Sequence, residues 1–125
     1  MECKIKSLYI CVKNLDRAVA FWEDFFERPI DRWEQLGGMF DINGFRFMLF
    51  DYQVVGEKHI FGSNCLPSIE VESLKVLQEK LAEKEICFPL TQIGPNWVAE
   101  FVDSEGNHIE IFTPVTRKKA NENNC

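Results

Sequence analysis

The residues best suited to chemistry in this sequence are His108 and Glu110, which stand two positions apart in a run of strand-forming residues. Alternate residues of a strand share a face, so the imidazole and the carboxylate are predicted to lie on the same side of a sheet. They could supply two metal ligands, with Glu70 as a third, or a general base and its partner. The alternative is that His108 is a hydrogen-bonded pocket or rim residue without a catalytic role.

The cysteines favour neither a disulfide framework nor a zinc knuckle. Their number is odd and no two have Cys-x-x-Cys spacing, so free thiols in a reducing cytoplasm are the simplest expectation. The second histidine, His59, stands beside Glu57 in a polar segment and is expected to be a solvated loop residue. The five cysteines are Cys3, Cys11, Cys65, Cys87 and Cys125.

The elements that must position these residues occur twice along the chain. In the first half, an alternating run at 5–12 precedes Asn14, a candidate helix N-cap, and a helical pattern that is expected to end at Pro29. Three strand-like runs follow, at 30–36, 39–42 and 45–52, separated by Gly37-Gly38 and by Asn43-Gly44. The apolar face of the helix consists of Ala18, Phe21, Trp22 and Phe25.

The second half repeats this order. A strand at 66–71 precedes the candidate cap Ser73 and a helix with a stripe of leucines, and three strands follow at 86–93, 97–102 and 108–113. We therefore predict an α+β fold of two tandem βαβββ modules, about 5–52 and 65–114, within a single domain at 1–115. A crossover loop is expected at 53–64 and a disordered tail at 116–125. The leucine stripe is Leu74, Leu77 and Leu81, and the last two turns are Gly94-Pro95 and 105–107.

Strand alternation sorts the side chains into two faces. One face is apolar and is predicted to lie under the helices as the core; its members include Ile10, Val12, Phe47 and Leu49, with Ile109 and Ile111 in the second half. The other face mixes aromatic, polar and ionisable groups, as the lining of a small-molecule pocket does, and the two modules could curve around one such cavity. A face that is simply solvated is the alternative. The residues predicted to bind a ligand are Ser7, Tyr9, Arg46, Met48, Phe50, Leu66, Ser68, Glu70, His108, Glu110 and Phe112.

Two segments carry a resemblance to a known superfamily. Residues 8–22, Leu-Tyr-Ile-Cys-Val-Lys-Asn-Leu-Asp-Arg-Ala-Val-Ala-Phe-Trp, and residues 102–112, Val-Asp-Ser-Glu-Gly-Asn-His-Ile-Glu-Ile-Phe, resemble the opening and closing motifs of the glyoxalase / bleomycin resistance protein / extradiol dioxygenase (vicinal oxygen chelate) superfamily. The resemblance implies a glyoxalase-like curved mixed sheet around a cavity, a homodimer and, in many members, a divalent metal.

Carried over residue by residue, the metal site implied by the resemblance is incomplete. The usual ligand positions fall on Ser7, Met48 and Leu66, and only the closing carboxylate, Glu110, is retained. Serine and leucine are not usual ligands of Zn, Fe or Mn, and a thioether favours softer ions. We therefore expect no family metal site and no cofactor.

Two functions follow from these observations. The first is a metal-free small-molecule binding protein of the bleomycin-resistance type, with aromatic walls that include Trp33 and Trp97 and an antibiotic or cationic aromatic ligand. The second is a metal-dependent lyase, isomerase or dioxygenase of the same superfamily. The net charge of −6 and the pI of about 4.9 argue against nucleic acid, and no signal peptide or membrane-spanning stretch is visible, so a cytoplasmic location is expected.

Overall fold

The computed structural model describes residues 1–2, 5–56, 59–61 and 66–115 of the chain. Its contacts divide it into two compact units. The first comprises Met1–Gly62 and Ser104–Asn107, and the second comprises Ser63–Asp103 and His108–Cys125. The predicted disordered tail at 116–125 and part of the predicted crossover loop lie outside the described residues.

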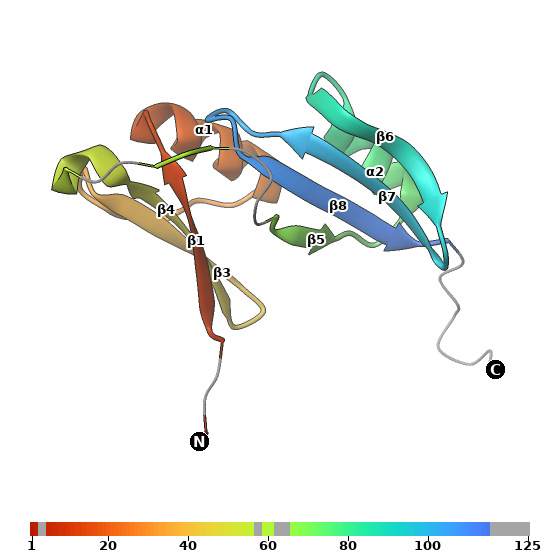
Figure 1. Ribbon diagram of the computed structural model, residues 1–125, viewed down its shortest axis with the longest axis horizontal. Helices are drawn as coiled ribbons and strands as arrows, with labels where there is room; N and C mark the ends of the chain where they lie inside the picture. The colour runs from red at the N-terminus through yellow and green to blue at the C-terminus, as the bar shows by residue number, and fades with distance from the viewer. Residues whose placement is uncertain (3–4, 57–58, 62–65, 116–125) are drawn as a thin grey trace. The chain divides into compact units, whose positions relative to one another are not determined.

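In its described residues, the first unit contains one α-helix, a short 3₁₀ helix and a four-stranded mixed sheet. Its elements are β1 (Ser7–Val12), α1 (Leu15–Phe26), β2 (Asp31–Trp33), β3 (Gly37–Ile42), β4 (Phe45–Asp51) and a 3₁₀ helix, η1 (Tyr52–Val55). The strand order is β1-β4-β3-β2, with β1 parallel to β4 and the other neighbours antiparallel (Figure 1).

The second unit repeats this arrangement. Its elements are β5 (Ser68–Glu70), α2 (Leu74–Leu81), β6 (Glu85–Ile93), β7 (Asn96–Val102) and β8 (His108–Pro114). Strand order is β5-β8-β7-β6, again with the first strand parallel to the last. The predicted α+β fold of two βαβββ modules is therefore confirmed, and each module forms its own sheet.

Both helices begin at the predicted caps. The side chain of Asn14 accepts a hydrogen bond from the backbone N–H of Arg17 at 3.0 Å, and Ser73 accepts one from Val76 at 3.1 Å. Helix α1 ends at Phe26, before Pro29, because Glu27 takes a left-handed conformation with φ 58° and its N–H bonds to Glu23. No helix among the described residues is both long and apolar enough to cross a membrane.

The core of the first unit lies between α1 and the sheet, as strand alternation predicted. The Trp22 ring is fully buried and its centroid lies 4.8 Å from that of Phe47 on β4. Phe26 packs against Phe40 and Phe47 as well. Other buried members of this core are Ile10, Val12, Leu15, Ala18, Val19, Phe25 and Leu49.

A second core belongs to the second unit and lies beneath α2. Leu77 is fully buried, whereas Leu74 and Leu81, also predicted for the stripe, are half-buried. The sheet contributes alternate residues of β7 and β8. Two of them, Ile109 and Ile111, are residues that strand alternation predicted for the core. These buried residues are Ala99, Phe101, Ile109, Ile111 and Thr113.

The prediction that Gly37-Gly38 forms a turn is wrong. Both glycines belong to β3, opposite Phe50 and Leu49 of β4. The turn lies directly before them, at 34–36. A Cβ at Gly37 would overlap the carbonyl oxygen of Leu49, so glycine is required by close backbone approach rather than by a turn. Asn43-Gly44 does form the predicted hairpin turn, with φ of 52° and 86°.

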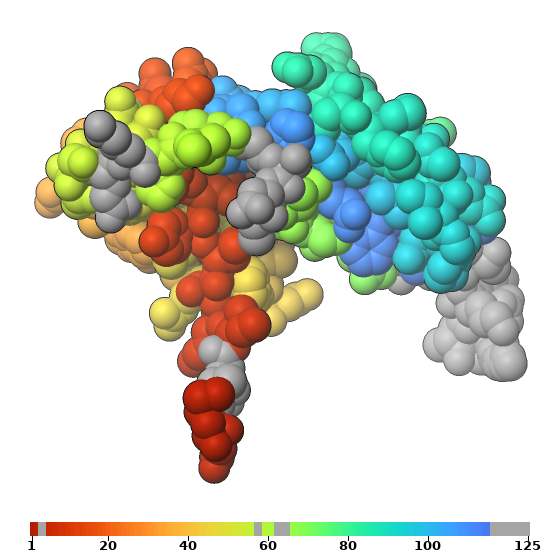
Figure 2. Space-filling view, in the orientation of Figure 1, coloured from red at the N-terminus to blue at the C-terminus, as the bar shows by residue number. Residues whose placement is uncertain are grey.

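Strand β6 is the edge strand of the second sheet and most of its side chains are exposed. Figure 2 shows this segment, coloured blue-green, along the surface of the second unit. The ladder between β6 and β7 shifts register between Ile86 and Phe88 and again between Phe88 and Thr91. The side chains of β6 are thus placed irregularly along an accessible edge.

Candidate functional site

The face of the first sheet opposite α1 carries the predicted ligand-binding residues of the first unit. Strand register places Ser7 beside Arg46, Tyr9 beside Met48, and Cys11 beside Phe50. The rings of Tyr9 and Phe50 lie edge to face with centroids 5.5 Å apart, and Tyr9 is 53% exposed. The sheet therefore presents an aromatic pair flanked by a thioether, a thiol and a guanidinium.

Trp33 extends this face. Register places Trp33 beside Gly37 of β3, and Gly37 beside Phe50 of β4. An open pocket of about 460 Å³ is lined by Trp33, Leu36 and Val54, together with Glu34 and Gln35. The expected aromatic wall at Trp33 thus lies on the same side of the sheet as Tyr9 and Phe50.

Trp97 does not fulfil the corresponding role in the second sheet. It alternates with the buried residues Ala99 and Phe101 of β7 and pairs with Thr113 of β8, which is also buried. The side chain therefore shares the core face, and its assignment as a pocket wall is wrong. The alternation of Trp97 with the apolar residues Ala99 and Phe101 along one strand is the sequence signal for this placement.

The predicted residues of the second unit gather on the open face of its sheet. Ser68 pairs with Glu110, and Glu70 pairs with Phe112, in the parallel ladder between β5 and β8. The Ser68 hydroxyl donates a hydrogen bond to Oε2 of Glu110. Leu66 precedes β5 and is half-buried.

His108 pairs with a carboxylate other than the expected one. Its Nδ1 lies 2.7 Å from Oε2 of Glu100 on β7, while Glu110 is engaged by Ser68. Residues two apart on one strand are separated by more than 6 Å, whereas side chains diagonal across a ladder are within reach of one another. His108 is thus a hydrogen-bonded residue, which was one of the alternatives left open by the sequence, and its partner is Glu100.

Glu100 also accepts a hydrogen bond from Cys87 of β6, with 3.0 Å between Sγ and Oε2. Burial raises the pKa of the Cys87 thiol to about 11, and the hydrogen bond and charge of Glu100 and the charge of Glu85 add to this rise. The thiol therefore stays protonated at neutral pH. Cys87 and Glu100 were not among the predicted site residues, although the alternation of β7 places Glu100 on this face.

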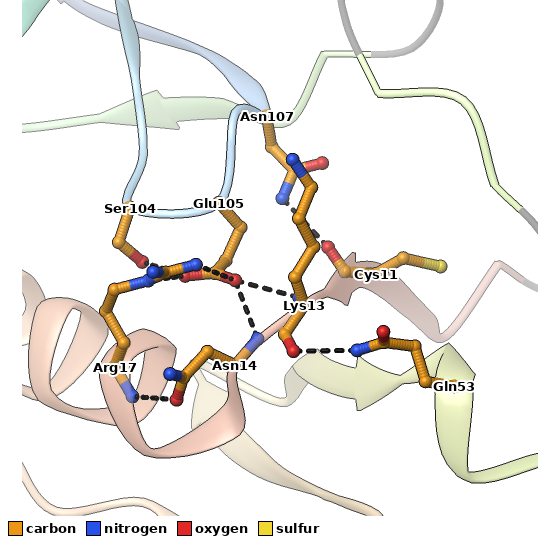
Figure 3. Close-up of polar contacts among 8 residues, drawn as sticks. All are labelled: Cys11, Lys13, Asn14, Arg17, Gln53, Ser104, Glu105 and Asn107. Carbon is orange, nitrogen blue, oxygen red and sulfur yellow. Dashed lines mark hydrogen bonds and ion pairs between the residues drawn. The ribbon is translucent and has the colours of Figure 1, made fainter.

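A buried carboxylate, Glu105, makes several of the polar contacts drawn in Figure 3. Its Oε1 accepts the backbone N–H groups of Lys13 and Asn14 at 2.8 Å, and Arg17 binds both oxygens at 2.6 and 2.9 Å. Burial opposes ionisation of Glu105, but these donors outweigh it and hold the pKa of the carboxyl below its usual range. This group joins the 104–107 turn to the start of α1 and is structural.

The donors at the family metal positions do not fit a divalent ion. Ser7 and Met48 offer a hydroxyl and a thioether on the first sheet, and Met48 lies beside Tyr9. In the second unit Leu66 has no donor atom, and the Glu110 carboxylate already binds Ser68. Hard and borderline divalent ions require imidazole, thiolate or several carboxylate ligands, which this set lacks.

Comparison with known proteins gives likeness of structure but not of sequence. No protein-family model matches the chain, and no curated protein matches it. A glyoxalase/bleomycin resistance protein/dioxygenase from Nocardioides superposes with a TM-score of 0.73 at 16% identity, covering 99% of this chain and 91% of that one.

Two further solved structures are similar. Lactoylglutathione lyase from Agrobacterium tumefaciens gives a TM-score of 0.66 at 16% identity, covering 90% of this chain and 94% of that one. A glyoxalase/bleomycin resistance protein/dioxygenase family enzyme from Burkholderia phytofirmans gives 0.71 at 11% identity, covering 90% and 100%. The chain has the fold of these proteins, and the predicted resemblance to their superfamily is confirmed at that level.

Proposed function

We propose that the protein binds a small flat or cationic organic molecule, without chemistry at the family metal positions. The observation that carries this proposal is the pair formed by exposed Tyr9 and half-buried Phe50 on the open face of the first sheet, next to Met48. Aromatic faces attract both flat rings and cations, and a thioether adapts to the shape of a ligand.

The charge of the chain supports a cationic ligand. The net charge is −6, which raises the local concentration of cations. In the second unit, Glu70 and Glu110 lie on the open face of its own sheet and contribute to this negative charge. A homodimer and a cytoplasmic location are part of this proposal; sedimentation equilibrium of the purified protein would test the dimer.

The test is fluorescence titration of the chelator-treated protein with a planar cationic aromatic dye and with its neutral analogue. Tyr9→Ala is expected to weaken binding of the cation by about tenfold, since a desolvated cation–π contact contributes about 1–2 kcal/mol. Phe45→Ala is the matched control, because Phe45 is an exposed aromatic of the same sheet on the other face. That variant should bind the dye as the wild-type protein does.

Two results would contradict the proposal. One is equal loss of binding in the Tyr9 and Phe45 variants, which would mean that the dye adheres to exposed aromatics in general. The other is binding that requires added Fe, Mn, Ni or Zn and is lost in Glu110→Gln, which would favour the metal-dependent enzyme instead.

A further inference from the structure

Three potential metal ligands from three neighbouring strands meet in the second unit. The ligand atoms of Cys87 on β6, Glu100 on β7 and His108 on β8 all lie within 4.8 Å of one another. Oε2 of Glu100 is the centre of the group, 3.0 Å from the Cys87 Sγ and 2.7 Å from the His108 Nδ1. None of these residues occupies a family ligand position.

The backbone of β6 creates this convergence. Ile86 pairs with Phe101 and Phe88 pairs with Glu100, so Cys87 is the extra residue of a bulge in the ladder. A bulge re-aims a side chain that regular alternation would send elsewhere. Here it brings the thiol to Glu100, which the β7–β8 hairpin already holds beside His108.

Charge on this face also favours a cation. Glu100 lies directly opposite Glu110 in the antiparallel ladder, and like charges at such positions destabilise a sheet. Glu85, on the same strand as Cys87, adds negative charge near the thiol. The side chains of Glu100 and His108 are 22% and 27% exposed, so an ion could reach them from solvent.

The spacing suits tetrahedral zinc. Bond lengths of about 2.3 Å to sulfur and 2.0–2.1 Å to nitrogen or oxygen place tetrahedral ligand atoms about 3.3–3.6 Å apart. The two observed separations from Glu100 are those of hydrogen bonds, so each needs to lengthen by only a fraction of an ångström. A thiolate, an imidazole and a carboxylate together select zinc over magnesium or calcium.

We propose that Cys87, Glu100 and His108 bind one Zn²⁺ ion, with the fourth position open to water. Binding replaces the hydrogen bonds from the Cys87 S–H and the His108 Nδ1–H to Glu100 by S–Zn, N–Zn and O–Zn bonds. The thiol proton passes to solvent, and the imidazole proton moves from Nδ1 to Nε2. His108 binds through Nδ1 as the neutral imidazole, with its remaining proton on Nε2. Three protein ligands and one open position are the arrangement of an exchangeable or reactive zinc site rather than a closed structural one.

The experiment titrates the full-length, chelator-treated protein with Zn²⁺ against a chromophoric chelator, and with Co²⁺ to detect the thiolate-to-metal absorption band. One equivalent of zinc is expected to bind. Cys87→Ser, Glu100→Gln and His108→Gln should each weaken binding. The cysteine variant should do so by more than about 100-fold, which is the upper range for loss of a residue that only orients a metal ligand. The matched control is Cys11→Ser, which removes a half-buried thiol of the other unit.

The outcomes separate this site from alternatives. Loss of the cobalt band in Cys87→Ser with its retention in Cys11→Ser supports the proposal. It is overturned if zinc does not bind stoichiometrically, or if Cys11→Ser or Glu110→Gln abolishes binding while Cys87→Ser does not. Thermal unfolding of each zinc-free variant shows whether it folds, and Glu100→Gln and His108→Gln provide independent readings should the cysteine variant fail to fold.

Discussion

Glu105 has the lowest exposure of any charged side chain in the described part of the molecule, at 2%. Its carboxylate satisfies two backbone N–H groups at the start of α1 and pairs with Arg17. We expect Glu105→Gln to lower the free energy of unfolding by about 2–4 kcal/mol, because a buried charged acceptor is lost and the Arg17 pair is broken. Urea denaturation at neutral pH measures this.

The control for that substitution is Glu79→Gln, an exposed position of α2. Surface substitutions of this kind change stability by less than about 0.5 kcal/mol. Equal small effects of the two substitutions would show that the contacts of Glu105 contribute little to stability.

Individual site residues were predictable only to the extent that local alternation determines them. Parity correctly gave the faces of Tyr9, Met48 and Phe50, because β1 and β4 pair in regular register. The partner of His108 depends on how β7 pairs with β8. The position of Cys87 depends on a bulge in the ladder between β6 and β7. Both are properties of two strands together, which no single-strand pattern contains.

At the scale of elements, β3 depends on a close backbone approach at Gly37. Gly37→Ala is expected to destabilise the protein by about 2–4 kcal/mol, since the added methyl would overlap the Leu49 carbonyl and force β3 and β4 apart. Gly44→Ala, with φ of 86° but no atom within 4 Å, should cost only about 1–2 kcal/mol. Thermal unfolding of both variants compares the two effects, and a larger loss for Gly44→Ala would contradict this explanation of β3.

The helices and the Asn43-Gly44 hairpin were predictable because their signals are local. Asn14 and Ser73 cap through hydrogen bonds to residues three positions later, and Asn-Gly turns need only their own backbone angles. The Gly37-Gly38 pair has the composition of a turn, but its role is set by Leu49, a residue twelve positions away from Gly37.

At the scale of the whole molecule, the internal repeat was the most informative property of the sequence. Two modules with the same order of elements and the same parity give two sheets of the same topology. The fold does not fix the chemistry, because structural relatives at 11–16% identity show likeness of fold alone. The positions at which the resemblance implies metal ligands carry Ser7, Met48 and Leu66 beside Glu110.

The free energy of unfolding of the whole molecule should depend on pH through Glu105. Its pKa is lower in the folded state than in the unfolded chain, so the unfolded state binds the proton more readily. This contribution is fully present above the ordinary glutamate pKa of about 4.3 and is lost as pH falls through the lower folded value. Within that window, protonation of Glu105 lowers the free energy of unfolding by at most about 1.4 kcal/mol for each pH unit. Urea denaturation of the wild-type protein and of Glu105→Gln, between about pH 2.5 and 6, gives the free energy of unfolding against pH for each. The two curves should converge as the pH falls, because the other carboxylates contribute equally to both. Parallel curves would show that Glu105 titrates alike in the folded and unfolded states.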